Sequence, residues 1–255
     1  MFDPPMMVGP WAFADPVDAV YGEAPRCPSC GTFIAGRPWM PPYRVRLIKG
    51  MKSAAPGDVI SGPGIGGFLA SQRFVVEFER ANLKGIERWE PVDIEGYNDY
   101  EGSPLSSPTA PGRPFELAIL PVPTTRAVWE AMHPVFKGEV IGCDLCGRRG
   151  RILDSYQGVV VDEASWTGAD IFELAHFGDL IVTEAFVEFI ASGEFTGIPL
   201  VPAAERVPYR AGQALGDWSA SRSIASWQFR SPSRRSLLAF TSSRTPPVSS
   251  VSEFK

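Results

Sequence analysis

The chain has 255 residues, of which 44% are hydrophobic and 21% are charged, and its formal net charge is −5. These values are typical of a globular protein with one medium-sized core or two small ones. No apolar run approaches the roughly 20 residues of a membrane span, so no membrane partner is expected. The charge is uneven: residues 1–203 hold 16 basic and 26 acidic side chains, and residues 204–255 hold 8 and 3. The acidic body argues against nucleic acid as its ligand and is compatible with a basic protein partner, or simply with solubility.

The N-terminal segment, residues 1–26, is rich in proline and small side chains, and we expect an irregular lead-in there. It has acids among its apolar residues and no basic start, so it does not resemble a secretory signal peptide. We therefore expect a cytoplasmic protein whose paired thiols stay reduced and free to bind metal.

Two strands and a long loop are predicted further along the chain. Residues 43–48 alternate in part between apolar and polar and indicate a strand, as do residues 115–122. Residues 96–114 are rich in Gly, Pro and Ser and favour a surface loop. Residues 93–101 mix acids with tyrosines; we interpret them as a solvated loop, with a contact surface for a basic partner as the alternative.

Residues 62–67, GPGIGG, contain the GxGxxG pattern of a dinucleotide-binding turn. Such a turn must join a buried strand to a helix. Here the apolar run before it is very short, and the helix is expected to begin later, after Ser71. We therefore interpret these glycines as a flexible loop.

An internal repeat is the most informative pattern. Residues 68–86 resemble residues 180–198, and each stretch ends in a Gly-Ile pair. The positions that match at an offset of 112 are Ser71 and Thr183, Phe74 and Phe186, Val75 and Val187, Gly85 and Gly197, and Ile86 and Ile198. The pattern predicts two copies of a strand–helix–strand unit.

The residues of each predicted copy suit the start, the buried face and the end of a helix. A short apolar strand ends at Ser71 or Thr183, whose hydroxyl can cap the first free amides of a helix. Large apolar residues four apart, such as Phe74 and Phe78, share one helical face and are expected in the core. The glycine after each helix permits a turn with positive φ before the next apolar run.

All four cysteines fall in two CxxCG motifs, CPSCG at 27–31 and CDLCG at 143–147, which repeat at an offset of 116. A Cys-x-x-Cys turn aims two sulfurs at one ion, and two such turns complete a tetrahedral site. Closing the long chain between the motifs costs about 4 kcal/mol of entropy, whereas structural zinc contributes roughly 10–16 kcal/mol. We therefore predict one structural zinc ion, bound by Cys27, Cys30, Cys143 and Cys146.

Other roles fit these cysteines less well. A thioredoxin-like centre needs a CxxC that opens a helix, and neither motif is followed by a helix start. Two separate disulfides would each close a very small loop in a reducing compartment. Four thiolates leave zinc no open position, and His133 and His176 have no nucleophile or carboxylate at a diagnostic spacing. We therefore predict that the protein is not an enzyme.

Residues 204–255 differ from the rest of the chain, because Ser and Arg dominate and the periodic pattern is lost. We expect this segment to be disordered, and a basic arm that touches nucleic acid is the alternative. The predicted division is a double-CxxCG body at 1–203 and a Ser/Arg-rich tail at 204–255.

The two CxxCG motifs, together with residues 170–172, 181–186 and 197–198, resemble the double-CxxCG motif family, a set of bacterial paralogues. Some of its members are described as immunity proteins, which protect a cell from toxins exchanged with kin during swarming. The resemblance covers residues 25–200 and implies an immunity function here, with a cognate protein toxin as the partner. It implies no toxin-contacting residues.

The sequence thus predicts an α+β fold in which duplicated strand–helix–strand units are joined by a zinc-ribbon-like site of four cysteines. The predicted function is a cytoplasmic immunity protein that neutralises a toxin by direct binding. The alternative is a zinc-ribbon nucleic-acid-binding module of regulatory type, which the run RRGR at 148–151 and the basic tail favour.

Overall fold

The structure of the chain, a computed structural model, describes residues 13–49, 56–62, 67–99, 102–105, 115–137, 142–149, 152–156, 158–177, 180–198, 200 and 203. Its strands are β1 (Phe13–Pro16), β2 (Val20–Tyr21), β3 (Trp39–Met40), β4 (Arg44–Ile48), β5 (Val59–Ser61), β6 (Gly67–Ser71), β7 (Arg88–Pro91), β8 (Asp93–Asn98), β9 (Phe115–Ile119), β10 (Val135–Lys137), β11 (Gly142–Cys143), β12 (Arg148–Arg149), β13 (Ile152–Ser155), β14 (Ile171–Glu173) and β15 (Leu180–Val182). Its helices are α1 (Gln72–Arg80), α2 (Glu184–Ser192) and the 3-10 turns η1 (Trp129–Met132) and η2 (Glu163–Ser165). The fold is α+β, rich in sheet, with two α-helices among the described residues.

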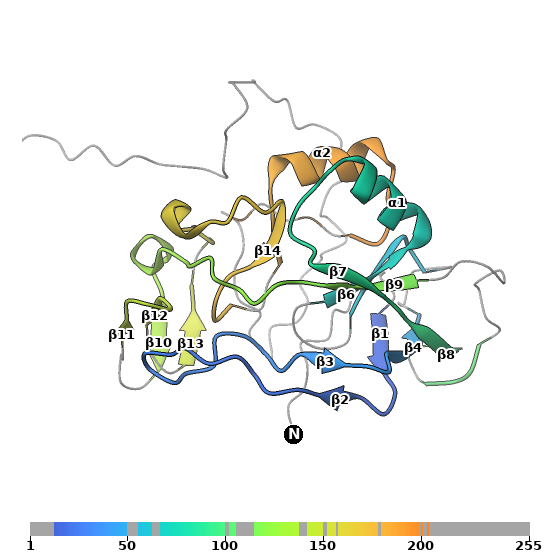
Figure 1. Cartoon of the computed structure of the whole chain (residues 1–255), viewed down its shortest axis with the longest axis horizontal. Helices are drawn as coiled ribbons and strands as arrows, with labels where there is room; N and C mark the ends of the chain where they lie inside the picture. The colour runs from blue at the N-terminus through green and yellow to red at the C-terminus, as the bar shows by residue number, and fades with distance from the viewer. Residues whose placement is uncertain are drawn as a thin grey trace, which may run out of the picture.

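The largest sheet has seven strands in the order β7-β9-β6-β5-β1-β4-β8 (Figure 1). Strand β1 pairs in parallel with β5, and β4 pairs in parallel with β8, while the other neighbours are antiparallel. The sheet therefore collects strands from distant parts of the chain, and the edge strands are β7 and β8.

Strand β1 corrects the expectation that residues 1–26 form an irregular lead-in. Residues 13–16 lie inside the large sheet between β5 and β4, where Ala14 is buried opposite Leu47. Pairing with distant strands overrides the local proline content, and Pro16 is tolerated because it is the last residue of its strand.

The predicted strand at 43–48 is confirmed as β4, and that at 115–122 is confirmed in part, because β9 ends at Ile119. The predicted loop at 96–114 begins later than expected, since β8 continues to Asn98. Most of that predicted loop lies outside the described residues.

Two apolar cores lie on the two faces of the large sheet, because neighbouring side chains of a strand point to opposite faces. Leu69 and Leu117 belong to one core, and Phe68 and Ala118 belong to the other. Helix α1 and helix α2 both contribute to this second core, and Figure 1 shows them side by side above β6, β7 and β9.

Each helix begins at the hydroxyl that the sequence predicts. The Ser71 hydroxyl accepts a hydrogen bond from the Phe74 amide at 3.3 Å, and the Thr183 hydroxyl accepts one from the Phe186 amide at 3.5 Å. Phe74 and Phe186 are buried, and their ring centroids lie 6.4 Å apart. The predicted caps and core positions are therefore confirmed.

A hairpin precedes each helix where the sequence predicts a single strand. Strands β5 and β6 lead into α1, and strands β14 and β15 lead into α2. The first strand of each hairpin has three residues, too few to show a period in the sequence. A strand, β7, follows α1, whereas the described residues after α2 contain no strand.

An aspartate just before each hairpin makes the same contacts in the two hairpin–helix segments, residues 58–86 and 170–198. The Asp58 carboxylate accepts from the Ser71 hydroxyl at 2.9 Å, and the Asp170 carboxylate accepts from the Thr183 hydroxyl at 2.9 Å. Each also reaches the other segment: Asp58 accepts from the Thr196 amide at 3.1 Å, and Asp170 accepts from the Lys84 amide at 2.9 Å. Each hairpin therefore contacts the residues that follow the other helix.

The glycine after each helix lies where the chain passes against the opposite hairpin. Gly85 has a φ of 121° and Gly197 has a φ of 92°. A methyl group on Gly85 would come 1.9 Å from the Ile171 carbonyl oxygen, and one on Gly197 would come 2.0 Å from the Val59 carbonyl oxygen. Both the backbone conformation and the close approach require glycine.

A third apolar core is formed by residues of the second half of the chain and includes Trp129, Met132, Leu174 and Ile181. Strand β14 links this third core to the second core, to which both helices contribute. Ile171 packs in the second core, while its neighbour Phe172 packs in the third. Among the described residues, no helix is long and apolar enough to cross a bilayer. The predicted tail at 204–255 lies outside the described residues, so the division at 203 stays a prediction.

Candidate metal centre

The two CxxCG motifs adopt the same turn. The Gly31 amide donates to the Cys27 carbonyl at 2.8 Å, and the Gly147 amide donates to the Cys143 carbonyl at 2.8 Å. Both glycines have positive φ, 69° and 73°. Glycine adopts this conformation without strain, so the fifth residue of each motif closes the turn that carries its two sulfurs.

The residues that flank each motif also pair in the same way. Arg26 forms a bridge with Phe33, and at the same offset of 116 Gly142 pairs with Arg149 in the small β11–β12 hairpin. Each pair of cysteines is thus presented by a tight antiparallel turn.

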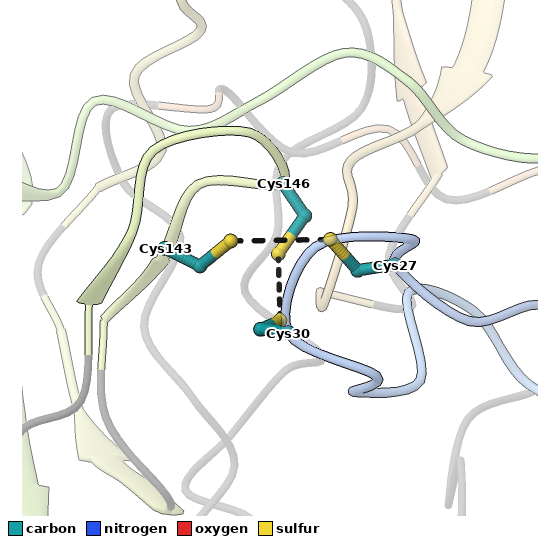
Figure 2. A group of neighbouring side chains, drawn as sticks. All are labelled: Cys27, Cys30, Cys143 and Cys146. Carbon is teal, nitrogen blue, oxygen red and sulfur yellow. Dashed lines mark hydrogen bonds between the residues drawn. The ribbon is translucent and has the colours of Figure 1, made fainter.

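The turns bring all four sulfurs together, as Figure 2 shows. The sulfur atoms lie within 4.8 Å of one another, with Cys27 and Cys143 at 3.9 Å and Cys30 and Cys146 at 3.8 Å. A tetrahedron with Zn–S bonds of about 2.3 Å has edges of about 3.8 Å. A disulfide needs about 2.05 Å, so the four thiols are free. Number, type and spacing of these donors fit a tetrahedral zinc ion.

Burial of the sulfurs is unequal. Cys27, Cys143 and Cys146 are buried, and the partly buried Ile34 packs against them, whereas Cys30 is exposed. Four cysteines fill a tetrahedral coordination sphere, so a bound ion would have no position left for substrate. The arrangement suits a structural metal that fixes two distant segments.

The polar surroundings favour thiolates at some of the cysteines. Hydrogen bonds from the amide and the hydroxyl of Thr32 lower the pKa of Cys30 to about 6. The Cys146 amide lowers the pKa of Cys143, whereas burial raises the pKa of Cys146 to about 12. Metal-free, the cluster therefore mixes thiols with thiolates, and a bound zinc ion would supply the positive charge that stabilises four thiolates.

Side chains from outside the motifs hold the second turn in place. The Trp129 indole donates to the Gly147 carbonyl at 2.6 Å, and Arg126 donates to the Asp144 carbonyl at 2.9 Å. Arg126 also forms an ion pair with Asp162 at 2.7 Å. The second motif is therefore tied to the third core and not only to its own hairpin.

One polar contact joins the two motifs directly. The Arg148 guanidinium donates to the Thr32 hydroxyl, and these two residues occupy the same position, immediately after each motif glycine. From the sequence, Arg148 counts only toward the nucleic-acid alternative and Thr32 has no expected role, although the shared offset of 116 marks the two residues as equivalent. Arg126 and Trp129 carry no such signal, because only the fold brings them to the motif.

The two histidines do not join the cluster. The His176 amide donates to the Ile34 carbonyl at 3.1 Å, which places the half-buried side chain beside the first motif, where burial lowers its pKa. His133 is exposed and follows η1. Among the described residues, the one cluster of three or more potential metal ligands is that of the four cysteines.

The alternative interpretation of residues 93–101 as a contact surface fits the structure poorly. Tyr97 is 6% exposed and belongs to the core on the face of the large sheet that is opposite the helices. The Asp99 carboxylate accepts from the Ser103 amide at 2.7 Å and so shapes its own turn. Tyr100 and Glu101 lie outside the described residues.

No protein-family model matches the chain, and a search of curated proteins found no match. The resemblance to the double-CxxCG motif family therefore stays a prediction that rests on the residues named above.

Proposed function

We propose that the four cysteines bind one structural zinc ion and that the protein acts by binding another protein. The observation that carries this proposal is the cluster of four sulfurs, whose spacing suits zinc and whose number leaves no open coordination position. A metal held in this way supports a scaffold and performs no chemistry on a substrate.

The scaffold is, in this proposal, a duplicated unit of hairpin, helix and glycine turn, and the two CxxCG turns form a zinc-ribbon-like centre between the copies. The supporting observations are the matching hydrogen bonds of Asp58 and Asp170 and the matching close approaches of Gly85 and Gly197. All four obey the same offset of 112. Chance similarity of two short motifs would not reproduce reciprocal contacts.

The partner, in this proposal, is a cognate protein toxin, and the protein is a cytoplasmic immunity protein. The family resemblance supports this identity, and the excess of acidic residues in 1–203 favours association with a basic surface. Such a protein acts by occupancy, so protection requires a stable complex and no turnover.

Co-expression tests this function. The toxin encoded beside this gene would be produced in a sensitive host with and without the intact chain, and the expected result is survival only in its presence together with a complex that co-purifies. Absence of both protection and a complex, with zinc-loaded folded protein present, would contradict the immunity function and leave the metal site untouched.

A nucleic-acid-binding module is the second candidate, and the arginines of the second motif are the feature that favours it. Arg148 donates to Thr32, however, and Arg149 lies 3.5 Å from Asp144 and 3.7 Å from Glu130, so both side chains already have partners in the fold. A mobility-shift assay at rising salt distinguishes the two candidates, because phosphate binding would weaken steeply with salt.

A further inference from the structure

The four cysteines of the candidate metal centre differ in their access to solvent. Cys27, Cys143 and Cys146 are buried, whereas Cys30 is exposed. The Cys30 sulfur nevertheless faces the cluster, 3.8 Å from the Cys146 sulfur, as Figure 2 shows. Because the shell around a metal site controls solvent access, a ligand from solvent would meet the Cys30 side of the site first.

The two turns that carry the cysteines are anchored differently. The Gly31 carbonyl accepts from the guanidinium of the exposed Arg26, which flanks the same motif, at 2.9 Å. The equivalent Gly147 carbonyl accepts from the indole of Trp129, which is buried in the third core. The second turn is therefore fixed to the interior, whereas the first turn, which carries Cys30, is held at the surface.

Thr32 forms a hydrogen-bond network on the exposed side of the site. Its amide and its hydroxyl both donate to the Cys30 sulfur. The same hydroxyl accepts from the Arg148 guanidinium, which leaves its single proton for the sulfur. In the second motif the Arg148 amide donates to the Cys146 sulfur. The residues at equivalent positions thus each bond to a sulfur, and the first motif adds a hydroxyl bond at the exposed cysteine.

We propose that Cys30 is the ligand that detaches first from a bound ion and that Thr32 is a positioning residue that opposes this detachment. The inference rests on the proposed zinc site. With Cys30 detached, the three buried sulfurs would still hold the ion, and a ligand from solvent could take the fourth position. The hydrogen bonds from Thr32 stabilise the charge of the Cys30 thiolate and fix its direction. Exchange of the metal would therefore be controlled at the first motif.

Limited alkylation tests which ligand detaches first. The zinc-loaded full chain would be treated with less than one equivalent of iodoacetamide, which forms a sulfur–carbon bond as iodide leaves. Peptide mass spectrometry would then locate the modified cysteines. We expect Cys30 to be modified about tenfold more than each of the three buried cysteines, because reaction requires an accessible sulfur.

Zinc transfer to a chromophoric chelator, 4-(2-pyridylazo)resorcinol, tests the role of Thr32. The variant Thr32→Val removes the hydroxyl and keeps the shape, and we expect both zinc transfer and Cys30 alkylation to become about tenfold faster. Thr32→Ser keeps the hydroxyl and is expected to stay within about twofold of the unmodified chain. The matched control Thr167→Val, at an exposed position outside the metal centre, is expected to stay within the same limit. Circular dichroism and zinc content check that the variants are folded and loaded.

Three results would overturn the proposal. Similar alkylation of all four cysteines would show that the site opens as a whole. Transfer from Thr32→Val at the rate of Thr167→Val would remove Thr32 from the positioning role, and equal acceleration by Thr32→Ser would show that the hydroxyl is not the cause. A folded chain without zinc would contradict the proposed metal centre itself, whereas zinc-loaded protein with uniform alkylation would count against this inference alone.

Discussion

At the scale of single residues, the Asp58 carboxylate joins the first hairpin to helix α1 and to the segment after helix α2. Its carboxylate accepts from the Ser71 hydroxyl and the Thr196 amide and forms an ion pair with Arg73 at 2.7 Å. Burial alone would raise the pKa of Asp58, but the hydrogen bonds from Arg73 and Ser71 outweigh it and hold the pKa below its ordinary value. The ionised form is therefore the one that the fold stabilises.

This lowered pKa gives a pH dependence with a definite sign. Because the folded pKa of Asp58 lies below the unfolded value of about 3.9, its contribution is complete above that value and is lost as the pH falls through the folded pKa. We expect Asp58→Asn to cost about 1–2 kcal/mol at pH 7 and to lessen the loss of stability below about pH 4. Urea unfolding from pH 7 to pH 3 measures both effects. The exposed Asp93 supplies the control Asp93→Asn, and equal behaviour of the two variants would contradict the role of Asp58.

At the scale of elements, the close approach of each glycine turn to the opposite hairpin determines how the two hairpin–helix segments fit together. Gly85 and Gly102 both have positive φ, 121° and 91°. A methyl group on Gly85 would meet the Ile171 carbonyl oxygen, whereas one on Gly102 would have no atom within 4 Å. A comparison of substitutions at the two positions therefore separates the cost of a positive φ from the cost of a steric collision.

We expect Gly102→Ala to cost about 1 kcal/mol, because only the left-handed conformation is penalised. Gly85→Ala adds a collision with backbone, and we expect it to cost at least about 2 kcal/mol more and to loosen both hairpins. Thermal unfolding of the two variants gives the comparison. Similar melting temperatures would mean that the turn at Gly85 and the hairpin at Ile171 do not approach as closely as described.

At the scale of the whole molecule, the four-cysteine cluster is where the N-terminal part of the chain and the second half meet. Elemental analysis should find one zinc ion per chain. We expect Cys143→Ser to remove the metal and to speed hydrogen exchange in β4 as well as in β14, because one ion fixes segments that belong to different cores. Leu145, which is 59% exposed within the same motif, supplies the control Leu145→Ser, for which normal zinc content and exchange are expected. A Cys143→Ser protein with exchange altered only at its own hairpin would contradict this coupling.

The sequence predicts the features that depend on local spacing. The caps at Ser71 and Thr183, the glycine turns, and the four cysteines of the cluster all follow from residue type and offset, because each needs a particular side chain at a fixed distance along the chain. Strand β1 and the pairing of Trp129 with the second motif do not follow, since both are decided by contacts between distant segments.

The contacts between the two helices also bear on when the fold can form during synthesis of the chain. Phe74 and Phe78 need Phe186 and Phe189 to complete their core, and those partners are made about 110 residues later. At the usual speed of translation this interval is on the order of ten seconds. Until then the aromatic side chains of α1 lack these partners, and Cys27 and Cys30 form only half of a binding site. Synthesis of residues 143–189 supplies both missing halves, so the apolar core and the thiol cluster become complete within the same stretch of synthesis.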